Sequence, residues 1–206
     1  MSYRISVLEC PNCAATDIKP EQGFCHWCGS ALIISDFNSI YTMNQNTYQE
    51  YADKLKSSEN HYQENGMNGD YESTLGMVYL RLGNTEFAVN AFRKAVAAGI
   101  QNPETYFYLG IAVLNGKRPF LNNRNTVKDA IRHIETALQM EKKGIYYFMA
   151  AFIEYDFYVM KHLRPPNPIE IYMDNAKRYG VTKNDIEMVF DMAHCRVPDE
   201  LIKQLK

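Results

Sequence analysis

The sequence predicts a mainly α-helical protein in which helix-turn-helix repeats stack into a solenoid behind a small cysteine-rich N-terminal module. Between Tyr71 and Pro103, small and aromatic residues recur at helical spacings on either side of a break at Gly83. Leu75-Gly76 returns as Leu109-Gly110 after 34 residues. A single helix pair cannot bury its apolar face alone, so such pairs are expected to stack.

The bulk composition is that of an ordinary folded protein. The chain has 206 residues, of which 46% are hydrophobic and 22% charged, and a formal net charge of -2. A charge this small gives no global attraction to nucleic acid or to an anionic membrane. No apolar run approaches the roughly 18 residues that span a bilayer, and the N-terminus lacks the features of a signal peptide. We therefore expect a cytoplasmic protein with no membrane partner.

Four of the five cysteines form two Cys-x-x-Cys pairs near the N-terminus: Cys10, Cys13, Cys25 and Cys28. A Cys-x-x-Cys turn places two thiolates on one side of a tight loop, and two such turns facing each other give the tetrahedral sulfur shell that zinc accepts. Residues 1–34 contain too few apolar side chains to fold unaided, so metal binding, worth on the order of 10 kcal/mol, would supply the difference. The pattern predicts one structural zinc ion.

The run from CPNC to FCHWCG, with eleven residues between the pairs, resembles a zinc ribbon. The resemblance implies that all four cysteines are ligands and that residues 1–34 form the module. A redox Cys-x-x-Cys pair and an iron site are the alternatives, but no βαβ pattern of the kind that holds a redox pair follows. Gly29 is expected to take a positive backbone angle, and His26 to be an exposed side chain beside the ligands. Arg4 and Lys19 are outnumbered by acidic residues here, which disfavours phosphate binding by the module itself.

Residues 35–69 are predicted to be a linker followed by an N-terminal capping helix of about 45–63. Its apolar stripe is carried by Tyr48, Tyr51, Ala52, Leu55 and Tyr62. The turn dipeptides Asn65-Gly66 and Asn68-Gly69 would end this helix.

Residues 70–180 resemble tetratricopeptide repeats. The small, aromatic and alanine positions of that repeat fall on Gly76, Tyr79, Ala88, Phe92 and Ala95, whereas Glu72 replaces the consensus tryptophan. A second repeat is expected to open at Asn102-Pro103-Glu104, and its partner helix at a capping box, Thr126-x-x-Asp129.

The third repeat departs most from this pattern. It would comprise one aromatic helix over 145–163 and a second helix capped by Asn167-Pro168. Residues 181–206 are predicted to be C-terminal capping helices, the first starting at a capping box, Thr182-x-x-Asp185, and the last at Pro198.

The resemblance to tetratricopeptide repeats also implies a concave surface lined by the first helix of each pair. The side chains expected there are Met77, Arg81, Phe107, Ile111, Asn115, Tyr147 and Glu154. Aromatic residues and arginine anchor many protein interfaces, although any one of these aromatics is more readily explained by packing between repeats. We therefore expect a non-enzymatic adaptor or scaffold that binds a protein or peptide.

Catalysis finds little support in the sequence. The five histidines are scattered, and no phosphate loop, dinucleotide fingerprint or nucleophile elbow occurs. His194 and Cys195 are adjacent, so on a helix they would point about 100° apart. The alternative to an adaptor is a nucleic-acid-associated regulator that uses the ribbon and the basic stretch 117–143. The sequence leaves the partner and the oligomeric state open.

Overall fold

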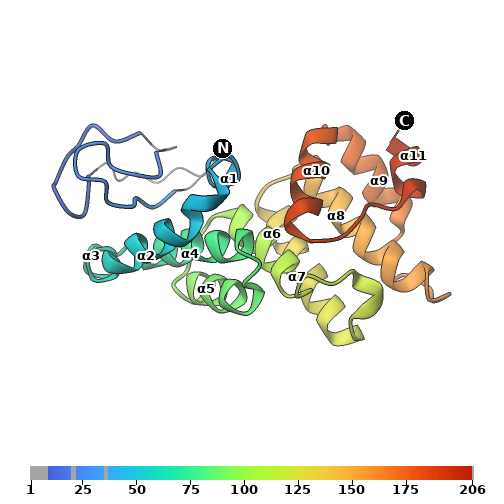
Figure 1. Cartoon of the computed structure of the whole chain (residues 1–206). Helices are drawn as coiled ribbons and strands as arrows, with labels where there is room; N and C mark the ends of the chain where they lie inside the picture. The colour runs from blue at the N-terminus through green and yellow to red at the C-terminus, as the bar shows by residue number, and fades with distance from the viewer. Residues whose placement is uncertain (1–8, 20–21, 35–36, 206) are drawn as a thin grey trace. The chain divides into compact units, whose positions relative to one another are not determined.

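The computed structural model describes residues 9–19, 22–34 and 37–205, and it divides the chain into two compact units, Met1–Thr105 and Tyr106–Lys206 (Figure 1). Helices dominate both, which confirms the mainly α-helical prediction. Within the described residues there is no strand, and an isolated bridge joins Phe24 to Ala31. No described helix is both long and apolar enough to cross a bilayer. Residues 1–8 of the predicted ribbon and 35–36 of the predicted linker lie outside the described residues.

The first unit contains α1 (Phe37–Tyr41), a 3₁₀ turn η1 (Gln45–Thr47), α2 (Tyr48–Ser57), α3 (Glu59–Glu64), α4 (Asn68–Arg81) and α5 (Thr85–Ala97). The helix α6 (Pro103–Ala112) begins at its end. Asn102 caps α6 as expected, because its side-chain oxygen accepts a hydrogen bond of 2.9 Å from the backbone of Glu104.

Two predictions for this unit were wrong. The single helix expected over about 45–63 is broken at Ser58, which lets Tyr62 stack on Tyr71 at a centroid distance of 5.8 Å. Residues 37–41, predicted to be linker, form α1 because Phe37 and Ile40 are buried. The hydroxyl of Tyr48 lies 2.9 Å from the carbonyl oxygen of Ile40, at the C-terminal end of this short helix.

α4 and α5 are packed side by side, joined by a turn in which Gly83 has a φ of 74° (Figure 1). Gly76 lies where the two helices come closest: a methyl group there would approach the ring of Phe92 to 2.7 Å. A small residue was predicted at Gly76, and the structure places Gly76 at the close approach of the two helices.

The second unit contains the turn η2 (Pro119–Leu121), α7 (Arg124–Met140), α8 (Gly144–Glu154), a π-helical turn η3 (Tyr155–Val159), α9 (Ile169–Arg178), α10 (Lys183–Met192) and α11 (Asp199–Leu205). α8 packs against both α7 and α9. Gly110 of α6 lies against α7, since a methyl group there would be 2.8 Å from Ile134 and 2.9 Å from the carbonyl oxygen of Ala130.

The helix starts of this unit were predicted with mixed success. The capping box at Thr182 and Asp185 is present. α7, in contrast, begins before Thr126, with Asn123 as its cap, because the Asn123 side chain accepts a hydrogen bond of 3.0 Å from the Thr126 backbone. Asn167 does not cap α9. Its amide donates instead to Glu135 and Glu154, at 3.3 and 3.2 Å.

The aromatic helix predicted over 145–163 changes from α to π geometry after Glu154. This change accompanies the burial of Asp156, whose carboxylate receives both the guanidinium of Arg118 and the backbone N–H of Phe120, the latter at 2.8 Å. A π-helical turn inserts one extra residue and so redirects a side chain.

Candidate metal centre

Two short turns of similar construction carry the cysteines. In the first, the backbone N–H of Ala14 donates to the carbonyl of Cys10 at 3.0 Å, and in the second that of Gly29 donates to Cys25 at 2.8 Å. The residue after the last cysteine is left-handed in both: Ala14 has a φ of 56° and Gly29 a φ of 72°. The positive angle expected at Gly29 is confirmed. The one at Ala14 was not predicted, because alanine gives no signal for it.

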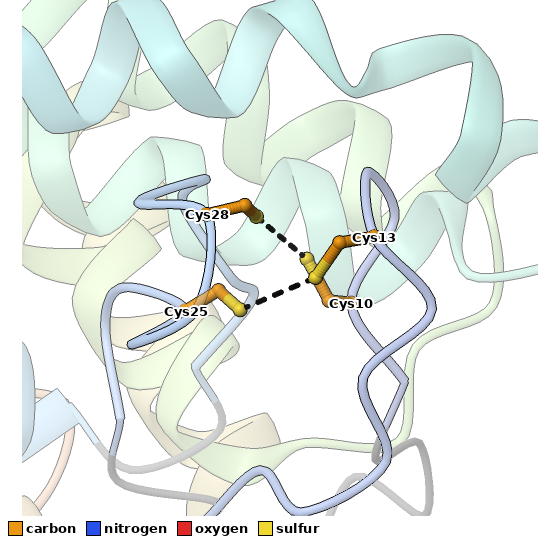
Figure 2. Close-up of side chains that lie close together, drawn as sticks. All are labelled: Cys10, Cys13, Cys25 and Cys28. Atoms are coloured by element: carbon orange, nitrogen blue, oxygen red, sulfur yellow. Dashed lines mark hydrogen bonds between the residues drawn. The ribbon is translucent and has the colours of Figure 1, made fainter.

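The four sulfur atoms converge on one point between the turns (Figure 2). All lie within 4.8 Å of one another, with 3.5 Å between Cys10 and Cys28 and 3.7 Å between Cys13 and Cys25. A tetrahedron with zinc–sulfur bonds of 2.3 Å has edges of about 3.8 Å. All four cysteines are free of disulfide bonds. The residues present therefore fit a single tetrahedral metal ion, as the sequence predicted.

Within this cluster, the pKa values of the thiol groups of Cys10, Cys13 and Cys28 are shifted in opposite directions. The hydroxyl and N–H of Ser30 lower the pKa of Cys28 to about 5. At Cys13 the N–H of Ala15 also favours the thiolate, but desolvation and three neighbouring thiols outweigh it and raise the pKa to about 12. Burial raises the pKa of Cys10. A bound divalent cation lets all four sulfurs be thiolates at once, because it offsets their mutual repulsion.

The four cysteines could supply every ligand of a tetrahedral metal ion. Cys10 and Cys25 are buried and form a small apolar cluster with Leu32, whereas Cys13 and Cys28 are exposed. Four protein sulfurs fill the coordination shell of a tetrahedral ion and leave no position for a substrate or an activated water molecule. The chemistry that this arrangement supports is structural stabilisation.

Buried tyrosines of the following helices hold the segment that leaves the second turn. Tyr51 of α2 donates its hydroxyl proton to the carbonyl of Leu32, and Tyr62 of α3 donates to Ala31 at 3.4 Å. The backbone of Ile34 donates to the hydroxyl of Thr74 on α4 at 3.1 Å. Sequence reasoning found the apolar stripe but missed these bonds, although tyrosine rather than phenylalanine at 51 and 62 was the available signal.

Exposed polar and aromatic side chains surround the second turn. Trp27 is 69% exposed, and its indole N–H donates to Asp17 at 3.0 Å, which lowers the pKa of that carboxyl group. The imidazole of His26 lies 3.3 Å from the same carboxylate. His26 is thus an exposed neighbour of the ligands, as predicted.

The seven side chains expected to bind a partner have different environments. Four of them are buried, namely Met77, Phe107, Ile111 and Glu154. Arg81 is half-buried, with its guanidinium 4.5 Å from the ring centre of Tyr41.

Asn115 and Tyr147 keep accessible surface: Asn115 is exposed in a left-handed turn, and half-buried Tyr147 stacks on Tyr179 at 5.4 Å. Among the four buried side chains, Phe107 stacks on Tyr146 at a centroid distance of 4.4 Å. Partner binding by this set stays a prediction.

Comparisons with known protein families, with curated proteins and with solved structures each returned no match.

Proposed function

We propose that this protein is a non-enzymatic adaptor in which a zinc-ribbon module and tetratricopeptide-like helix pairs bind another protein. The observation that carries the proposal is the closed four-sulfur site, which supports a structural and not a catalytic role for the metal. The close α4–α5 crossing at Gly76 supports the repeat assignment. Repeat pairs of this kind present extended surfaces to partners.

The remaining cysteine also fits a protein without nucleophilic chemistry. Burial raises the pKa of the Cys195 thiol to about 12, so the reactive thiolate is scarce at neutral pH. Free thiols throughout the described chain support a reducing compartment, and we infer a cytoplasmic location.

The proposal is tested by metal analysis and partner capture on three forms of the full chain: the natural sequence, Cys25→Ser and Cys195→Ser. We expect about one zinc ion per chain in the natural form and in Cys195→Ser, and a large loss of zinc in Cys25→Ser, because Cys25 belongs to the four-sulfur cluster and Cys195 does not. A protein partner should be retained in near-stoichiometric amount by the first two forms. Capture by Cys25→Ser should fall, since its N-terminal module is destabilised.

Two results would contradict this function. One is equal zinc content in the Cys25→Ser and Cys195→Ser proteins. The other is a natural protein that retains no partner from its native host and instead turns over a small-molecule substrate.

A further inference from the structure

A hollow of about 510 Å³ lies in the second unit, between the turn after α6 and the segment that joins α10 to α11. The first turn contributes Lys117, Arg118 and, from η2, Leu121. The second segment contributes His194 and Arg196. We call it the basic hollow. It brings two basic residues of the 117–143 stretch, Lys117 and Arg118, together with Arg196, which no sequence pattern linked to them.

The charge of the basic hollow is positive. Lys117, Arg118 and Arg196 line it, and the described residues that line it include no carboxylate. The guanidinium group of Arg118 is oriented by Asp156, which is 1% exposed. The two carboxylate oxygens of Asp156 accept hydrogen bonds of 3.1 and 3.2 Å from the Nε of Arg118. That pair is neutral overall, so Lys117 and Arg196 supply the net charge while Arg118 supplies an oriented guanidinium group.

The rim of the basic hollow is apolar on one side. Leu121 is 65% exposed, and η2 packs against η3. From η3 and the residues after it, Val159 is 37%, Met160 45% and Leu163 50% exposed. Of these side chains, Leu121 lines the basic hollow together with Lys117 and Arg118 and forms its aliphatic rim. Lys161, which lies between Met160 and Leu163 in the chain, has its ammonium group 5.0 Å from the ring centre of Phe120, the residue before Leu121.

We propose that the basic hollow and its aliphatic rim bind an acidic peptide segment of a partner protein. Carboxylates of the segment pair with Lys117, Arg118 and Arg196, and a neighbouring apolar side chain packs on Leu121. The inference rests on the proposed function and names the class of partner. Charge complementarity fixes the sign of the partner, and the aliphatic rim favours a peptide over a nucleic acid, whose bases would need exposed aromatic platforms.

The experiment measures binding of a fluorescein-labelled, glutamate-rich peptide with leucines at helical spacing to the full zinc-loaded chain, by anisotropy. Lys117→Gln/Arg196→Gln removes two charges from the hollow, and Leu121→Ser removes the apolar contact. The matched control, Lys177→Gln/Arg178→Gln, removes two exposed charges from the end of α9 in the same unit. Circular dichroism verifies that all variants keep the natural helix content.

We expect affinity to fall about tenfold in Lys117→Gln/Arg196→Gln and by a similar factor in Leu121→Ser, with the α9 control within about twofold of the natural protein. A peptide with glutamine in place of glutamate should not bind. The inference is overturned if the acidic peptide fails to bind, if the hollow variant binds it normally, or if an oligonucleotide of equal charge binds more tightly with the same dependence on Lys117 and Arg196.

Failure here is distinguishable from failure of the adaptor function. A partner captured equally well by the natural chain and by Lys117→Gln/Arg196→Gln leaves the adaptor in place and rules out the basic hollow as its docking site. A chain that binds neither the peptide nor any partner rules out both.

Discussion

Single hydroxyl groups connect the metal centre to the helices that follow it. The carbonyl of Leu32, four residues after Cys28, accepts a hydrogen bond from the hydroxyl of Tyr51, which is fully buried. Burial raises the pKa of Tyr51 well above its usual value, so the hydroxyl stays protonated and can donate. The bond holds the module against α2 without any charged group.

Tyr51→Phe should lower the free energy of unfolding by about 1–3 kcal/mol, because the Leu32 carbonyl is then buried without its donor. Chemical denaturation monitored by circular dichroism measures the loss. Tyr179→Phe is the control, since Tyr179 is half-buried and contacts Tyr147 through its ring. Equal stability of the two variants would show that the Tyr51 hydroxyl contributes nothing.

Glu154 is a buried acidic residue whose charged form destabilises the folded state. It is 1% exposed, and one of its carboxyl oxygens has no hydrogen-bond partner among the described residues. Burial raises its pKa from 4.5 to about 7, with Asn167 opposing the rise and the charge of Glu135 adding to it. The folded state therefore holds a proton between about pH 4.5 and pH 7 that the unfolded state has released.

The contribution of Glu154 to stability consequently falls as pH rises through that window, and its full cost is present above about pH 7. Glu154→Gln should raise the thermal midpoint at pH 8 and change it little at pH 4.5, because the glutamine carries no charge at either pH. Differential scanning calorimetry at the two pH values measures this. The exposed Glu170→Gln should show no such pH dependence, and a pH-independent effect of Glu154→Gln would contradict the assignment.

At the scale of elements, the helix pairs depend on two glycines at helix crossings. Gly76 faces the ring of Phe92, which is fully buried. Gly110 faces backbone as well as side chain, since the carbonyl oxygen of Ala130 would be 2.9 Å from an added methyl group. Backbone yields less than a side chain, so the second crossing is the less tolerant.

Gly76→Ala should destabilise the protein by about 1–2 kcal/mol, because a packing cost of about 1–3 kcal/mol exceeds the gain in helix propensity of up to about 1 kcal/mol. Gly110→Ala should cost more. Urea denaturation of both variants measures the difference. A stabilising effect at either position would mean that the helices are further apart than described.

At the scale of the whole molecule, the metal centre belongs to the unit Met1–Thr105 and the basic hollow to Tyr106–Lys206. Hydrogen bonds join α2, α3 and α4 to the segment 31–34 that follows the cysteines. Loss of a bound metal ion would therefore affect those helices first, because they are the elements hydrogen-bonded to the module.

Removal of zinc by a chelator should increase amide hydrogen exchange in 22–34 and in α2–α4, and leave α7–α9 close to their original protection. Mass spectrometry of the exchanged chain resolves the two units. The Cys25→Ser protein, which is expected to have lost most of its zinc, serves as the control and should respond much less to the chelator. Equal deprotection of both units would contradict this localisation of the metal's effect.

The sequence by itself determined the features that depend on neighbouring residues. The cysteine spacing predicted the four-sulfur cluster, since each turn is built from residues adjacent in the chain. Helix ends were equally readable at Gly83, at Asn102 and at the capping box of Thr182 and Asp185. Such features are recoverable because a turn or cap is satisfied within a few residues of itself.

Only the tertiary structure decided which of two locally acceptable roles a side chain takes. Asn167 was predicted to cap a helix, but its side chain donates hydrogen bonds to Glu135 and Glu154. Phe107 was predicted to lie on a binding surface, but it is buried and stacks on Tyr146. The basic hollow joins Lys117 to Arg196 across the chain. In each case the partner is far away in sequence, and burial, which sets the strength of a polar or apolar contact, is a property of the packed molecule alone.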